Sequence, residues 1–130
     1  MNAADTPPFV AHVGILHTEG TAESANAEVT LAPHLLNRTG SAHGGLITTL
    51  LDTTMSRSAL LACDGEGRVV TIEIKVSFIN PGRGTLHCQA WPTHRSASLV
   101  YLDGEVRDAS GLLIARGSAT FKHRPRPIDT

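Results

Sequence analysis

The chain has 130 residues, 41% of them hydrophobic, which suits one domain with a single core. Eleven Lys and Arg residues against 12 Asp and Glu residues give a net charge of −1, which argues against a nucleic-acid or anionic-membrane partner. Two cysteines are too few for a secreted disulfide scaffold, and neither a signal peptide nor a membrane span of roughly 18–20 apolar residues is evident, so we expect a soluble, cytoplasmic protein.

The N-terminal part is predicted to be a flexible lead-in followed by two strands. Residues 1–8 end in two prolines and carry little apolar character. Residues 10–19 and 24–31 show partial period-two alternation, which predicts extended structure. We place a single domain over residues 9–123 and a C-terminal tail over residues 124–130.

The segment 46–62 is predicted to be a long helix. It contains no proline and ends at the glycine-rich segment 64–67. Its apolar residues are spaced to cover a wide helix face: Leu46, Ile47, Leu50, Leu51, Met55, Leu60 and Leu61. At about 1.5 Å per residue, such a helix would be nearly as long as the domain is wide. We therefore expect it to be central.

The remaining chain is predicted to form consecutive strands. Residues 70–78 alternate strictly between apolar and polar types and end at Asn80-Pro81-Gly82. Three further extended segments follow, at 85–91, 97–107 and 112–121, with short connections that favour antiparallel pairing. One long helix and several antiparallel strands predict an α+β fold in which the sheet packs against the helix. The basic, proline-rich residues 122–127 are interpreted as a solvated end.

Two features around the helix could carry chemistry. Gly44 and Gly45 precede it, and the first amides of a helix carry a partial positive charge that stabilises a negative oxygen. Asp52 lies two turns further on among apolar residues, where a carboxylate is costly unless it is paired or functional. Both features also have structural explanations: a tight entry into the helix for the glycines, and neighbouring hydroxyls or solvent for Asp52.

Other common site types are not expected. The seven histidines show no spacing typical of a metal site, and neither a serine-nucleophile elbow nor a phosphate-binding loop is present. We therefore predict neither a bound metal nor a cofactor.

The spacing of Asn37, Gly44 and Asp52, together with the Ala-His-Gly-Gly run at 42–45, resembles a known family. The resemblance is to the hotdog-fold thioesterases of the phenylacetate-degradation (PaaI) type, and it extends from residue 37 to residue 121. It implies the hotdog fold, an antiparallel sheet wrapped around one long central helix. It also implies an acyl-CoA substrate, and a homo-oligomer, dimer or tetramer, with active sites at the subunit interface.

The resemblance implies a role for each matching residue. Gly44 would offer its backbone amide to the thioester carbonyl, and Asn37 would help to hold that region and the carbonyl. Asp52 of the partner subunit would act either as general base on water or as nucleophile. Thr71 would help to orient the water. Taken alone, Asn37 is typical of a turn or cap and Thr71 of an ordinary strand residue.

Substrate contacts are predicted at two further places. His43 and Gly45 flank Gly44 and are expected to contact the substrate. Arg95 and Ser96, in the turn at 94–96, are candidates for binding the phosphates of coenzyme A, which is part of the substrate and not a cofactor. Arg83 and Arg107 are weaker candidates for the same task, and all three arginines could equally be surface charges.

Two other functions compete with hydrolysis. A non-catalytic module that binds acyl-CoA or a hydrophobic ligand would keep the fold without turnover, and a hotdog hydratase would pair an aspartate with a histidine downstream of Asn-Pro, a pattern not seen here. A binding module has no need of a carboxylate within an apolar helix. Asp52 therefore favours hydrolysis.

Overall fold

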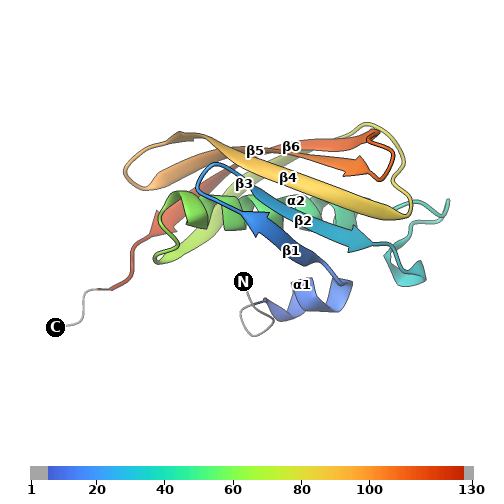
Figure 1. Cartoon of the computed structure of the whole chain (residues 1–130), viewed down its shortest axis with the longest axis horizontal. Coiled ribbons are helices and arrows are strands. Elements are labelled where there is room, and N and C mark those ends of the chain that lie inside the picture. Colours follow the sequence, from blue (N-terminus) through green and yellow to red (C-terminus); the bar gives the residue numbers. More distant parts are fainter. Residues whose placement is uncertain (1–5, 128–130) are drawn as a thin grey trace.

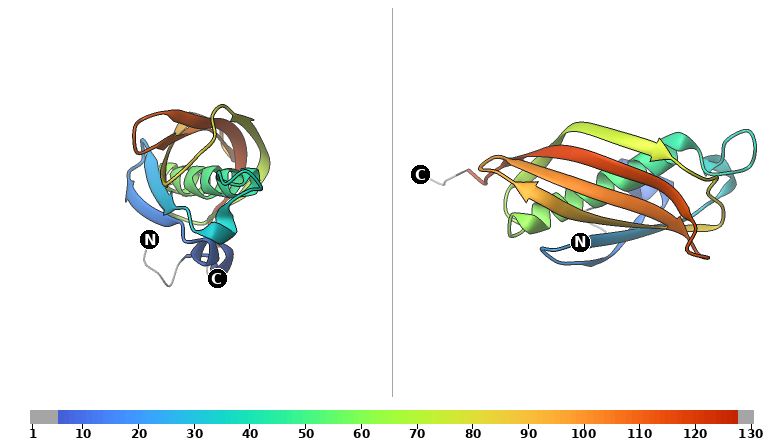
Figure 2. Two further views of the ribbon diagram at one scale, coloured as in Figure 1. Left: turned by 90° about the vertical axis from the view of Figure 1, so that its right-hand side faces the viewer. Right: turned by 90° about the horizontal axis from the view of Figure 1, so that it is seen from above.

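The computed structural model describes residues 6–127, and within this range one long helix packs against a six-stranded antiparallel sheet (Figure 1). The helix is α2 (Gly44–Ala62), and the strands are β1 (Leu16–Gly20), β2 (Ala25–Thr30), β3 (Arg68–Phe78), β4 (Thr85–Arg95), β5 (Leu99–Asp108) and β6 (Leu113–Arg124). They are hydrogen-bonded in the order β1-β2-β4-β5-β6-β3. Seen along α2, the sheet curls around the helix (Figure 2), which confirms the predicted α+β hotdog fold.

Helix α2 packs against the sheet through one face that is mostly apolar. Its buried residues recur every three or four positions: Leu46, Ile47, Leu50, Leu51, Thr54, Met55, Ser58 and Ala59. The helix begins two residues before the predicted start and ends at Ala62. Two residues later, Asp64 adopts a left-handed backbone with φ of 60°. No helix in residues 6–127 is long and apolar enough to cross a membrane.

The two faces of the sheet differ in polarity. On the outer face, cross-strand neighbours form polar rows, such as Trp91, Asp103, Ser118 and Lys75 across four strands. On the inner face, Gly104 and Gly117 lie opposite each other on β5 and β6. A Cβ atom on either glycine would come within 3.1–3.2 Å of a methyl group of Leu51. The helix therefore lies close to the sheet at this pair of glycines.

The predicted strand over 10–19 is wrong in its first half, which forms a short helix. Helix α1 (Pro8–Val13) begins with a proline, whose fixed φ suits the first helical turn, and ends at Gly14 with φ of 81°. Val10 is buried and joins the core, so β1 starts only at Leu16. Of the predicted lead-in at 1–8, residues 1–5 lie outside the described range, and the predicted tail is described as far as residue 127.

Strand β4 also continues beyond its predicted end. We expected the proline at position 92 to end it, yet β4 runs on to Arg95. The pairing with β5 shifts between Pro92 and His94. Proline is tolerated at such a bulge because the bulge leaves one amide without a ladder partner.

Strand β3 forms one edge of the sheet and is unusually apolar for an edge. It is 11 residues long and, within residues 6–127, pairs only with β6. Along and just after it, Val70, Ile72, Phe78 and Ile79 are between 45% and 57% exposed. Natural edge strands are usually short, charged or covered. This edge has the properties of a surface that pairs with another strand.

Candidate active site

The loop that leads into α2 is organised by the side chain of Asn37. Its Oδ1 accepts hydrogen bonds from the backbone amides of Thr39 and Ser41, at 3.0 and 3.1 Å. Its Nδ2 donates to Ser41 Oγ at 2.9 Å. The amide of Ala42 then donates to the carbonyl of Gly82, which ties the loop to the turn after β3. Asn37 thus fixes the approach of the chain to Gly44.

His43 caps the helix and leaves one amide free. Its Nδ1 accepts from the Gly45 amide at 2.9 Å, while its carbonyl accepts from Leu46 and Ile47. The Gly44 amide has no acceptor within residues 6–127. Gly45, predicted to contact the substrate, therefore has its amide engaged by His43. Gly44 is left as the helix-start donor that an incoming oxygen could use.

A pocket of about 370 Å³ adjoins this free amide. Asn37, Gly44, Ile47, Phe78, Ile79 and Pro81 are among the residues that line it. Most of this lining is apolar, so the pocket suits an apolar group attached to one hydrogen-bond acceptor. The sequence did not single out Phe78, because strict alternation made it look like an ordinary core residue of the strand.

Asp52 and Thr71 meet at the exposed edge of the sheet. The Thr71 hydroxyl donates to Asp52 Oδ1 at 2.8 Å. Thr48 and Thr49, which could have satisfied Asp52, instead donate to the carbonyls of Gly44 and Gly45. Oδ2 of Asp52 has no hydrogen-bond partner in the described part of the chain. The carboxylate is therefore oriented by one hydroxyl and keeps one oxygen available.

Within one chain the free amide and the carboxylate do not converge. Gly44 and Asp52 are separated by eight residues of one helix, or ~12 Å along its axis. The two groups also adjoin opposite halves of β3. Thr71 contacts Asp52, whereas a Cβ atom on Gly44 would lie 3.4 Å from the ring of Phe78. A single chain thus presents two half-sites along one strand edge.

The predicted phosphate-binding residues all have partners within the chain. Arg95 Nη1 donates to the Ala62 carbonyl at the end of α2, at 2.7 Å. Ser96 Oγ accepts from the Leu99 amide at 3.3 Å. Arg83 donates to the Gly40 carbonyl and Arg107 pairs with a neighbouring glutamate. These arginines stabilise turns and the helix end, and binding of phosphate by Arg95 and Ser96 stays a prediction.

One half-buried histidine packs against helix α2, which carries Asp52. His17 Nε2 on β1 is 3.2 Å from Thr53 Oγ1, and Nδ1 is buried without a partner in residues 6–127. Burial, assisted by the positive charge of Arg57, lowers the pKa of His17 to about 4. The ring is therefore neutral at ordinary pH and acts as a packing group between β1 and α2.

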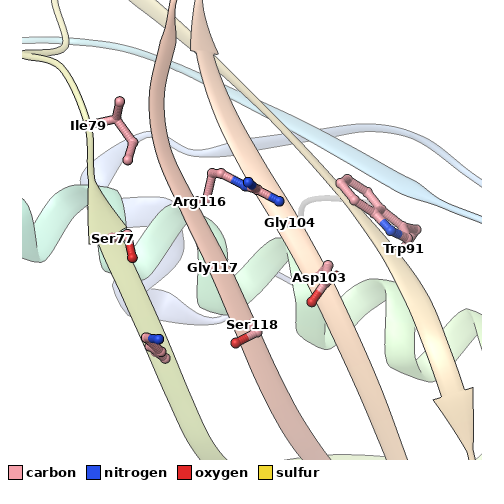
Figure 3. A pocket seen from close by; sticks show the side chains of 9 residues that line it. Ser77, Ile79, Trp91, Asp103, Gly104, Arg116, Gly117 and Ser118 are labelled. Carbon is pink, nitrogen blue, oxygen red and sulfur yellow. The ribbon is translucent and has the colours of Figure 1, made fainter.

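A second hollow lies on the outer face of the sheet (Figure 3). It measures about 380 Å³ and is lined by the polar rows of that face, including Trp91, Asp103, Arg116 and Ser118. None of the predicted site residues reaches it. In the described residues, no group of three or more His, Cys, Asp or Glu side chains could hold a metal ion.

Comparison with known proteins identifies relatives along most of the chain. A family model described as the thioesterase superfamily matches residues 39–115. A Mycobacterium tuberculosis protein named "putative esterase" is 28% identical over 122 residues, which cover 91% of this chain and 87% of the relative. S. sahachiroi AziG, known from a crystal structure, is 28% identical in sequence, with a TM-score of 0.86 over 92% of this chain and 98% of AziG. The E. coli PaaI protein, from the phenylacetic acid degradation operon, shares the fold at 19% identity, with a TM-score of 0.85 over 97% of this chain and 91% of PaaI.

Proposed function

Because the chain belongs to the thioesterase superfamily, we propose that it hydrolyses acyl-CoA thioesters at sites shared between two subunits. Each site would combine Asp52 and Thr71 of one subunit with Gly44 of the partner subunit. The observation that carries the proposal is the pair of half-sites at opposite ends of one exposed strand, an oriented carboxylate at Thr71 and a free amide beside Phe78.

Two-fold pairing of β3 would bring the half-sites together. When two copies of one edge strand pair in antiparallel fashion, the start of each strand lies beside the end of the other. The Thr71 end of one subunit would then adjoin the Phe78 end of the partner subunit, and with it Gly44. The exposed apolar residues of β3 support this pairing, because it would cover them.

The resulting chemistry needs only water as a co-reactant. The thioester carbonyl would accept a hydrogen bond from the Gly44 amide, which stabilises the negative charge that develops on the oxygen. Asp52 would then act in one of two ways. As general base it takes a proton from water while the water oxygen attacks the carbonyl carbon; as nucleophile it forms an anhydride that water hydrolyses. In both routes the C–S bond breaks, the OH of the water becomes part of the carboxylic acid, and the other proton of the water neutralises the departing thiolate.

The apolar pocket beside Gly44 would hold the acyl group. Its volume of about 370 Å³ falls within the range of small-ligand sites, and Ile47, Phe78 and Pro81 offer no charge to the substrate.

The buried, unpaired thiols of Cys63 and Cys88 support a cytoplasmic location.

The proposal is tested by measuring free-thiol release from aryl-, short- and medium-chain acyl-CoA esters. Asp52→Asn keeps the shape of the side chain and the acceptor for Thr71, but removes the charge. We expect kcat to fall by about 10²–10⁴-fold. Thr71→Ser, which keeps the hydroxyl, is the control and should retain most of the activity.

Two outcomes would contradict the proposal. If the wild-type protein hydrolysed none of these thioesters yet bound them in calorimetry, the chain would be a non-catalytic acyl-CoA binding module. If it hydrolysed them and Asp52→Asn had no effect, the carboxylate would have no part in the reaction.

A further inference from the structure

A basic pocket lies at the end of the sheet where β3 begins and β6 ends. It measures about 750 Å³, and four of its lining residues carry a permanent positive charge: Arg68, Lys122, Arg124 and Arg126. No acidic side chain of the described chain lines it. The sequence indicated only a solvated basic end here, because Arg68 is distant in sequence from residues 122–127.

The register of the two strands concentrates the charge. Arg68 lies directly opposite Arg124, and Lys122 lies opposite Val70, two residues along the same face. Like charges placed directly opposite each other in a sheet are destabilising. Arg126 is 3.8 Å from Glu66, whereas Arg68, Lys122 and Arg124 form no ion pair within residues 6–127. Three unneutralised cations on one face are suited to binding an anion.

The pocket is close to the proposed active site. Arg68 precedes Thr71 by three residues on β3, a distance of about 10 Å along the strand. In the proposed two-fold pairing, the Arg68 end of β3 would adjoin the turn after Phe78 in the partner subunit. That turn lines the pocket beside Gly44, so the cations would lie at the border of the shared site.

We infer that the basic pocket binds the phosphate groups in the nucleotide part of coenzyme A, an inference that rests on the proposed acyl-CoA hydrolysis. Arg68, Lys122 and Arg124 supply the charge, and Ser98, from the turn between β4 and β5, adds a hydroxyl to the lining. Arg95, the last residue of β4 before this turn, donates to the Ala62 carbonyl and lies outside this set.

The inference is tested by comparing two thioesters with the same acyl group, one of coenzyme A and one of pantetheine, which lacks the nucleotide. We expect Lys122→Gln/Arg124→Gln to raise KM for the coenzyme A ester by about tenfold or more. Its kcat, and its KM for the pantetheine ester, should be unchanged. Arg116→Gln removes a cation from the same face of β6, six residues before Lys122, and should leave both KM values unchanged.

The same variants separate failure of this inference from failure of the proposed function. An unchanged KM for the coenzyme A ester, or equal changes for both esters, would overturn the inference while hydrolysis stood. If neither ester were hydrolysed, calorimetric titration with adenosine 3′,5′-bisphosphate would decide. Binding that is lost in Lys122→Gln/Arg124→Gln and kept in Arg116→Gln supports the pocket, and absence of binding to the wild-type chain overturns it.

Discussion

Gly44 is important to the proposed reaction because its backbone amide has no hydrogen-bond partner, and less because it has no side chain. The next three amides of α2 all donate to His43, two to its carbonyl and one to its ring. Within the described residues the Gly44 amide alone of these four remains unpaired. The geometry therefore concentrates the positive end of the helix on a single donor beside an apolar pocket.

Substitution of Gly44 can separate the role of its backbone amide from the role of the space left by its missing side chain. Gly44→Pro removes the N–H, and proline is well tolerated at the first helical position because His43 already has an extended backbone with ψ of 138°. We expect kcat for acyl-CoA hydrolysis to fall by about 10²–10³-fold. Steady-state kinetics, with circular dichroism as a check on folding, measures the effect.

Gly44→Ala is the matched control for this experiment. It keeps the amide and adds a Cβ atom at 3.4 Å from the Phe78 ring, an ordinary van der Waals distance. It should therefore stay within a few-fold of wild-type activity. An equal loss of activity in the alanine and proline variants would mean that the space at this position, and not the amide, limits the reaction.

At the scale of elements, we expect the contact between β1 and α2 to weaken in acid. The pKa of His17 is lowered to about 4 in the folded chain, below its ordinary value of 6.5. The unfolded chain therefore binds more protons between these two pH values, and the free energy of unfolding falls as pH drops through that window. The contribution of His17 is fully present above pH 6.5.

His17→Gln should weaken this pH dependence. Urea denaturation at pH values of about 7.5, 5.5 and 4.5 should give midpoints that change less with pH than those of the wild-type chain. His94→Gln, on the exposed part of β4, is the control and should keep the wild-type dependence. If both variants behaved like the wild type, other groups would account for the loss of stability in acid.

The sequence predicted helices and strands well where one spacing of apolar residues continued over many positions. Helix α2 and strand β3 were found almost to the residue, because their apolar spacing is long and regular. Helix α1 was missed, because six residues are too few to show a helical period and Val10 suited either structure. The continuation of β4 past Pro92 depends on a bulge against β5, which local sequence does not reveal.

The candidate site was only partly predictable for a similar reason. The family resemblance suggested Asn37, Gly44, Asp52 and Thr71, and the structure brings Asp52 and Thr71 into contact. The occupied amide of Gly45 depends on the rotamer of His43, which the sequence does not specify. The basic pocket depends on the pairing of β3 with β6, so its residues are neighbours only in the folded chain.

At the scale of the whole molecule, the proposal of shared sites predicts that the enzyme is active only as an oligomer. Ile72→Lys places a charge on the exposed edge strand β3, where it should prevent pairing with a second copy without disturbing the core. We expect a folded monomer in analytical ultracentrifugation and loss of hydrolysis. Leu16→Lys, equally exposed on the opposite edge strand β1, should leave both properties unchanged. Activity in a monomeric Ile72→Lys protein would contradict shared sites.

The paired glycines under the helix suggest how this chain can change over evolutionary time. Leu51 fills the space that side chains at positions 104 and 117 would occupy. A methyl group gained at either glycine would have to be matched by a smaller residue at 51, or α2 would move away from the sheet. Because Asp52 is the next residue, such a shift would also carry the carboxylate away from Thr71. These three positions should therefore covary among relatives that keep the carboxylate, although two of them lie far from it in sequence.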